Sequence, residues 1–95
     1  MSTDPVVRRA AATASLPPGP DGRLVVAHLD TSEVYHLDAT GAAIWLAVDG
    51  RRNAGGIAVA VAERLGVPSS ALVEPSCRDF VGELLRLGLI EHVDP

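Results

Sequence analysis

The sequence has no lysine, only one cysteine and only three aromatic side chains. Its eight cations are all arginine and stand against twelve carboxylates, so the formal net charge is −4. This balance argues against nonspecific binding to nucleic acid, which depends on neutralising phosphates. The single cysteine, Cys77, can form neither an internal disulfide nor a metal site by itself. A reducing, cytoplasmic setting is therefore expected.

Long hydrophobic runs are absent as well. No run approaches the roughly 20 apolar residues that cross a bilayer. The alanine-rich stretch after Arg8 and Arg9 is short and is interrupted by Pro17-Pro18-Gly19-Pro20, so we expect neither a signal peptide nor a membrane partner. With few aromatics, the core must consist of Val, Leu, Ile and Ala. Trp45 and Phe80 are expected near its centre, because large rings bury the most area.

The length allows one small domain, which buries roughly two thirds of its unfolded surface. We assign it to residues 6–91, after a flexible segment 1–5 and before a tail 92–95. Residues 6–16 are expected to form a first strand, although their alanines would equally suit a helix. A turn containing Asp-Gly then leads into strands over residues 23–29 and 33–37. The result is a three-stranded antiparallel meander with a free edge.

The hydrophobic period changes from two to 3.6 at Asp38, a residue that can cap a helix with its carboxylate. The first helix is expected over residues 39–48. Asn53 can cap a second helix that ends at Gly66, and a third is expected over residues 75–87. Three strands followed by three helices predict an α+β fold. The tight turn between helices favours a winged helix-turn-helix architecture.

Residues that could carry out catalysis or bind a metal are sparse. The three histidines, His28, His36 and His92, are not at the spacing of zinc ligands. No phosphate-cradling Gly-rich loop, His-Glu-x-x-His or Gly-x-Ser-x-Gly motif occurs. Cys77 falls on the apolar face of the third helix, where a small buried hydrophobe is the commoner role. We expect a protein that is not an enzyme and has no cofactor and no metal; a reactive Cys77 is the enzymatic alternative.

Binding of an extended peptide suits this layout better. An edge strand lets a peptide add itself through main-chain hydrogen bonds, and side-chain pockets supply specificity. If the last strand is the edge and the third helix lies beside it, the two flank a groove. The candidate residues on the strand are Glu33, Val34, Tyr35, His36 and Leu37. Those on the helix are Cys77, Arg78, Asp79, Phe80, Val81 and Leu84, with Glu83 as a further charged rim. Spacing alone slightly favours the alternative, in which the helix stripe is core and the edge stays unpaired.

Three motifs carry a family resemblance. They are Gly22-Arg23-Leu24-Val25-Val26, then Tyr35-His36-Leu37-Asp38-Ala39-Thr40-Gly41-Ala42-Ala43-Ile44-Trp45 with Asp49-Gly50, and finally the stretch from Phe80 to Ile90. Together they resemble the PqqD-like family of RiPP recognition elements, where RiPP denotes a ribosomally made, post-translationally modified peptide. The family pattern is a strand pair, Tyr-x-Leu-Asn-x-Thr-Gly-x-x-Ile-Trp, Asp/Glu-Gly and a helix. Asp38 replaces the commoner Asn and preserves capping.

This resemblance implies a winged-helix domain that binds the leader segment of a precursor peptide as an added strand, beside the third helix. It most resembles the discrete leader-binding proteins of lasso-peptide biosynthesis, which work with a separate leader peptidase and a cyclase. A PqqD-type peptide chaperone for a radical-SAM enzyme is an alternative. A winged-helix DNA-binding regulator is another, but Arg51 and Arg52 have no basic stripe behind them, so no nucleic acid is expected as a partner.

Overall fold

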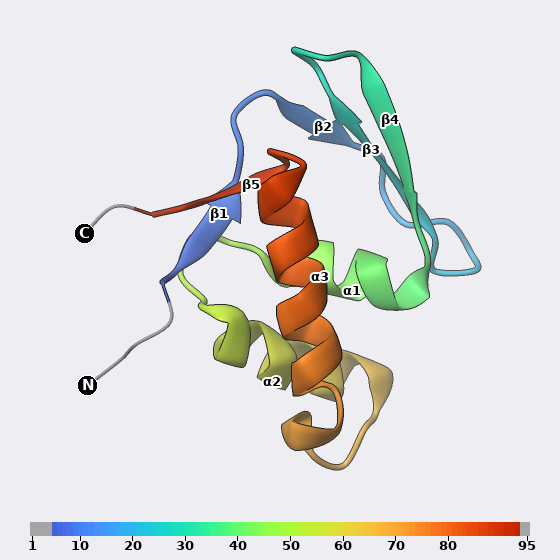
Figure 1. The fold of residues 1–95 in the computed structure, drawn as a ribbon. Coiled ribbons are helices and arrows are strands. Elements are labelled where there is room, and N and C mark those ends of the chain that lie inside the picture. The colour runs from blue at the N-terminus through green and yellow to red at the C-terminus, as the bar shows by residue number, and fades with distance from the viewer. Residues whose placement is uncertain (1–4, 94–95) are drawn as a thin grey trace.

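The computed structural model describes residues 5–93 and has an α+β fold (Figure 1). Three helices and a three-stranded antiparallel sheet are present, as the sequence predicted. In chain order the elements are β1 (Val7–Arg9), β2 (Thr13–Ser15), β3 (Leu24–His28), β4 (Glu33–Leu37), α1 (Ala39–Ala47), α2 (Ala54–Leu65), a short 3₁₀ turn η1 (Ser70–Leu72), α3 (Glu74–Arg86) and β5 (Ile90–His92). None of the helices in the described part of the chain is long and apolar enough to span a membrane.

The single first strand expected over residues 6–16 is wrong, because two short strands in different sheets take its place. β2 pairs with β3, but β1 pairs antiparallel with β5, so that Arg8 lies opposite Glu91. The chain turns between β1 and β2, where the Thr13 hydroxyl donates to the carbonyl of Ala10 at 2.7 Å. His92, expected in the tail, therefore belongs to a second, two-stranded sheet. The segment 1–5 expected to be flexible lies outside the described residues except for Pro5.

The predicted helix caps are confirmed. The Asp38 carboxylate accepts a hydrogen bond from the Gly41 N–H at 2.8 Å, and the Asn53 side chain accepts one from the Gly56 N–H at 2.9 Å. Each satisfies a backbone donor that has no partner inside its own helix. α2 ends at Gly66, which adopts the left-handed conformation with φ +70°. Local capping chemistry thus fixes where α1 begins and where α2 begins and ends.

The other two helix limits shift slightly. α1 ends at Ala47, one residue earlier than expected, and Gly50 does not cap it. Instead, Gly50 has φ +81°, and its N–H donates to the carbonyl of Val7 at 3.1 Å, which ties this turn to β1. α3 begins at Glu74, so Pro75 falls in the first turn, where a missing N–H has no cost.

Trp45 lies at the centre of the core, as expected, with 1% of its surface exposed. Its indole N–H donates to the Ser15 hydroxyl at 3.2 Å, and the Arg9 guanidinium lies 4.8 Å from the ring centroid. Phe80 is only partly buried and packs against the core from its margin. Part of the Phe80 ring therefore stays accessible.

α3 lies across α1 and α2, and its C-terminal end reaches the three-stranded sheet (Figure 1). At that end, a Cβ on Gly88 would come 3.4 Å from Nε2 of His28 in β3. The hairpin of β3 and β4 projects beyond the helices, and β4 lies at an edge of the sheet (Figure 1).

Candidate functional site

β4 forms an edge of the three-stranded sheet. The strand order is β2-β3-β4, and within residues 5–93 β4 pairs with β3 alone. An edge strand offers unpaired N–H and C=O groups to any extended chain that comes alongside. The free edge therefore lies where the sequence placed it, along Glu33–Leu37.

The direction of the backbone groups in β4 follows from the pairing of β2 with β3. The Leu16 N–H donates to the Val25 carbonyl at 3.2 Å, so the polar groups of Val25 point toward β2. Successive residues of a strand point their groups to opposite sides, and those of Val26 therefore point toward β4. Val26 is paired with Tyr35. The N–H and C=O of Tyr35 are consequently used inside the sheet.

The residues on either side of Tyr35 have the opposite orientation. The N–H and C=O of Val34 and His36 point away from β3, toward the free edge. Four backbone groups, two donors and two acceptors, are thus available to a peptide strand. Sequence analysis placed all five β4 residues in the site without separating these two from the others.

The side chains of β4 alternate between two faces. Leu37 is buried and Tyr35 is partly buried, whereas Val34 is 56% exposed on the outer face. The Tyr35 hydroxyl donates to the carboxylate of Glu33 at 2.8 Å, and this hydrogen bond raises the pKa of the phenol. The inner face of the strand therefore presents a neutral phenol and a carboxylate next to the buried Leu37.

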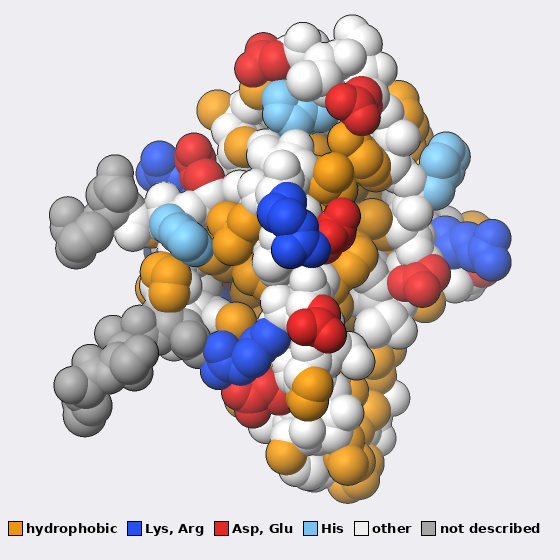
Figure 2. Space-filling view, viewed as in Figure 1, with side chains coloured by type: hydrophobic (Ala, Val, Ile, Leu, Met, Phe, Trp, Pro, Cys, Tyr) orange, Lys and Arg blue, Asp and Glu red, His pale blue; other side chains and the backbone are white. Residues whose placement is uncertain are grey.

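Phe80 brings α3 to the end of β4. A Cβ placed on Gly41 would lie 3.1 Å from Cζ of Phe80 and 3.4 Å from Cβ of Leu37. The ring therefore sits against the first turn of α1, next to the last residue of β4. Figure 2 shows apolar side chains along the junction of α3 with the three-stranded sheet, beside a row of charged side chains on α3. A peptide on the free edge would meet this apolar strip.

Three of the predicted helix residues face the core. Cys77, Val81 and Leu84 are 0%, 5% and 1% exposed, so for them the core alternative describes the free protein. Burial raises the pKa of the Cys77 thiol, which opposes formation of a nucleophilic thiolate. Arg78 and Asp79 are exposed, and Arg78 donates to the Glu74 carboxylate at 2.8 Å. Contact with a peptide stays a prediction for every residue of the site.

A metal site would need several His, Cys, Asp or Glu side chains close together. Among residues 5–93, no group of three or more His, Cys, Asp and Glu side chains is placed to hold a metal ion. His36 is exposed on β4, whereas His28 is partly buried, with Nε2 beside Gly88 and with no hydrogen-bond partner for Nδ1. The arrangement is suited to holding a chain by backbone pairing and apolar contact.

Sequence reasoning missed the outer face of the sheet. Side chains of all three strands leave a hollow of about 240 Å³ there, lined by Ala14, Ser15, Leu16, Val25, Ala27 and Val34. Leu16 is 65% exposed and Val34 is 56% exposed. Strict alternation along β3 and β4 was the available signal, because it puts Val25, Ala27 and Val34 on the face opposite Leu24 and Leu37. A strand added to β4 would extend this face.

Comparison with known proteins agrees with the geometry. Residues 23–90 match the family model described as coenzyme PQQ synthesis protein D (PqqD). Among solved structures, the chain is similar to one described as "TbiB1 in Complex with the TbiA(beta) Leader Peptide", with 27% sequence identity and a TM-score of 0.73. That likeness covers 93% of this chain and 99% of the other. No curated protein sequence gives a significant match.

Proposed function

The chain belongs to the PqqD family, and we propose that it is a RiPP recognition element that binds the leader segment of a precursor peptide without catalysing a reaction. The observation that carries the proposal is the free edge of β4, which offers the backbone groups of Val34 and His36 beside the apolar junction with α3. The similar solved structure is itself a complex with a leader peptide. Strand addition to β4 is the binding mode that this surface fits.

Backbone pairing supplies only part of the affinity. Each net hydrogen bond contributes about 0.5–1.5 kcal/mol, so four of them give about 2–6 kcal/mol. A micromolar complex needs about 8 kcal/mol, after the entropic cost of association has been met. Apolar leader side chains must therefore be buried as well. The partly buried rings of Tyr35 and Phe80 are placed to cover them.

We assign different roles to the predicted site residues. Val34 and His36 pair with the leader through their backbones, and Glu33, Tyr35, Leu37 and Phe80 contact its side chains. Arg78 and Asp79 form a charged rim on the solvent side of α3. Cys77, Val81 and Leu84 support Phe80 from the core and fix the distance between α3 and the sheet.

We further propose that residues 6–91 act as one winged-helix domain, with the hairpin of β3 and β4 as the wing. The bound leader would hold the core peptide in reach of a separate leader peptidase and a cyclase, as in lasso-peptide biosynthesis. A second candidate, a PqqD-type chaperone for a radical-SAM enzyme, has support from the description of the matched family. Both candidates require leader binding, and the precursor that binds separates them.

Fluorescence polarisation with a labelled leader peptide tests the proposal. The probe is the leader of a precursor encoded beside this gene, titrated with the full chain. Saturable binding is expected. Failure to bind at tens of micromolar protein, with helical content confirmed by circular dichroism, would contradict the assignment to that precursor.

A further inference from the structure

A second surface surrounds Leu46, away from the residues assigned to the leader. Leu46 is the one large apolar side chain of α1 that is not fully buried. It lines three hollows: one of about 440 Å³ between α1 and α2, one of about 370 Å³ toward β1, and one of about 150 Å³ toward the turn before β3. Small side chains at Ala43, Ala47 and Ala60 leave the first hollow open.

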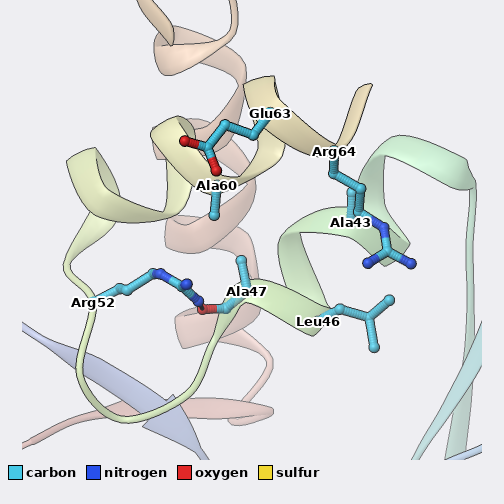
Figure 3. A pocket seen from close by; sticks show the side chains of 7 residues that line it. All are labelled: Ala43, Leu46, Ala47, Arg52, Ala60, Glu63 and Arg64. Atoms are coloured by element: carbon cyan, nitrogen blue, oxygen red, sulfur yellow. Dashed lines mark hydrogen bonds between the residues drawn. The ribbon is translucent and has the colours of Figure 1, made fainter. Parts of the chain in front are cut away.

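Positive charge is concentrated around these hollows. Four of the eight arginines line them, Arg8, Arg9, Arg52 and Arg64, whereas only two of the twelve carboxylates do so, Asp49 and Glu63. In a chain with a formal net charge of −4, this surface has the opposite sign from the whole. Figure 3 shows Arg52 and Arg64 entering the first hollow from opposite sides, with Glu63 above them on α2.

Two of these arginines are already paired inside the protein. Nε of Arg8 lies 2.9 Å from Oε1 of Glu91. Nη1 of Arg52 lies 3.2 Å from Oδ2 of Asp49 and also donates to the Ala47 carbonyl. These pairs hold the two side chains in place, and each carboxylate compensates the positive charge of its arginine. The remaining two arginines carry the surface's uncompensated charge.

Arg9 and Arg64 lie on two sides of Leu46. The Arg9 guanidinium lies over the Trp45 ring and donates one hydrogen bond to the Trp45 carbonyl at 3.1 Å. The Arg64 side chain makes no ion pair or hydrogen bond with another residue in the described range 5–93. Leu46 lines the hollow that contains Arg9 and also both hollows that contain Arg64. The surface thus has an apolar centre, Leu46, with an arginine on each side. A ligand with one large apolar side chain between carboxylates would match it.

We propose that this Leu46 surface (Leu46, Arg9, Arg52 and Arg64) docks an acidic peptide segment of a protein partner, with one large apolar side chain seated on Leu46. The planar guanidinium groups bind carboxylates in a bidentate manner, which favours Asp and Glu on either side of the apolar anchor. The apolar Leu46 at the centre of the surface offers a contact to a peptide side chain that a phosphate backbone does not use. The surface shares no residue with the leader site, so both are able to be occupied together.

The test uses a labelled synthetic peptide, Glu-Asp-Glu-Leu-Glu-Asp-Glu, titrated into the ¹⁵N-labelled full chain at low salt. The expected result is saturable shifts of the amides of Ala43, Leu46 and Arg64, with those of Val34 and His36 unchanged. Arg64→Glu should weaken binding at least fivefold. Arg86→Glu makes the same charge change at an exposed position on α3 and should weaken it less than twofold.

Other outcomes would overturn the proposal. Equal weakening by the two variants would mean attraction to net charge alone. No binding of the acidic peptide at millimolar concentration would show that the Leu46 surface does not bind acidic peptides. Preferential binding of a matched lysine peptide or a 12-base-pair DNA duplex would show that the surface binds another class of ligand. Because the acidic-peptide titration is read separately at the amides of Leu46 and Arg64 and at those of Val34 and His36, failure of one proposal is distinguishable from failure of the other.

Discussion

Phe80 and Gly41 lie so close together that a Cβ on Gly41 would be 3.1 Å from Cζ of the ring. Few real Cβ contacts are this short, so the glycine in α1 is what lets the α3 ring reach the end of β4. Gly41 of the sequence motif therefore has a structural purpose. It sets the position of the ring that is proposed to contact the leader.

Replacing Gly41 with alanine should weaken leader binding and lower the stability of the fold only modestly. The added methyl group displaces Phe80, and overpacking costs about 1–3 kcal/mol. The higher helix propensity of alanine offsets up to about 1 kcal/mol of this cost. We expect a net loss of up to about 2 kcal/mol in the free energy of unfolding, and a rise in the leader Kd of fivefold or more. Urea denaturation and fluorescence polarisation measure the two effects.

Gly82→Ala is the matched control, since a Cβ there meets no heavy atom within 4 Å. It should stabilise α3 by about 0.5–1 kcal/mol and leave the leader Kd unchanged. If the Gly41→Ala variant bound leader as tightly as the wild type, Phe80 would not be part of the leader-binding site.

Proline at Val34 should abolish much of the leader binding while the fold persists. The Val34 N–H points to the free edge, and proline is tolerated in an edge strand when the lost N–H faces solvent. We expect the leader Kd to rise at least tenfold, with a melting temperature near that of the wild type. Val34→Thr keeps the donor and the β-branched shape, and should bind within twofold of the wild type.

Proline at Tyr35 has a different expected result. Its N–H points into the sheet toward Val26, so the variant loses a ladder hydrogen bond and should unfold at lower urea concentration. If Tyr35→Pro and Val34→Pro gave the same stability, the orientation derived for β4 would be incorrect.

Asp49 should give the protein a pH-dependent contribution to stability at low pH. Its carboxylate accepts the Arg51 N–H at 2.9 Å, and with the nearby charge of Arg52 this lowers the pKa of Asp49. A pKa that is depressed on folding adds stability above the unfolded value, about 3.9, and that stability is lost as the pH falls through the folded value. Asp49→Asn should therefore flatten the fall in melting temperature below pH 4. An unchanged profile would show that Asp49 does not contribute.

Local chemistry made much of the fold predictable. Asp38 and Asn53 are capping residues followed by helical sequence, and both caps depend on neighbours within three residues. β1 was not predictable in this way. Its partner β5 lies at the other end of the chain, and an alanine-rich segment carries no alternation that would specify a register.

The site was predictable in location and less so in detail. An amphipathic period marks one face of α3, but Cys77, Val81 and Leu84 turn to the core while Phe80, one position before Val81, reaches α1 and β4. Which side of a helical stripe meets a neighbouring strand depends on the packing angle, which the period does not contain. The orientation of β4 likewise required the hydrogen bonds of β2.

Hydrogen exchange of the β4 amides, measured by NMR with and without saturating leader peptide, tests leader binding by strand addition most directly. In the free protein, the amides of Tyr35 and Leu37 should exchange slowly, because they point toward β3, and those of Val34 and His36 should exchange fast. Leader binding should slow Val34 and His36 at least tenfold. If both stay fast while leader is bound, the leader does not add to β4 and the proposed mode of recognition is wrong.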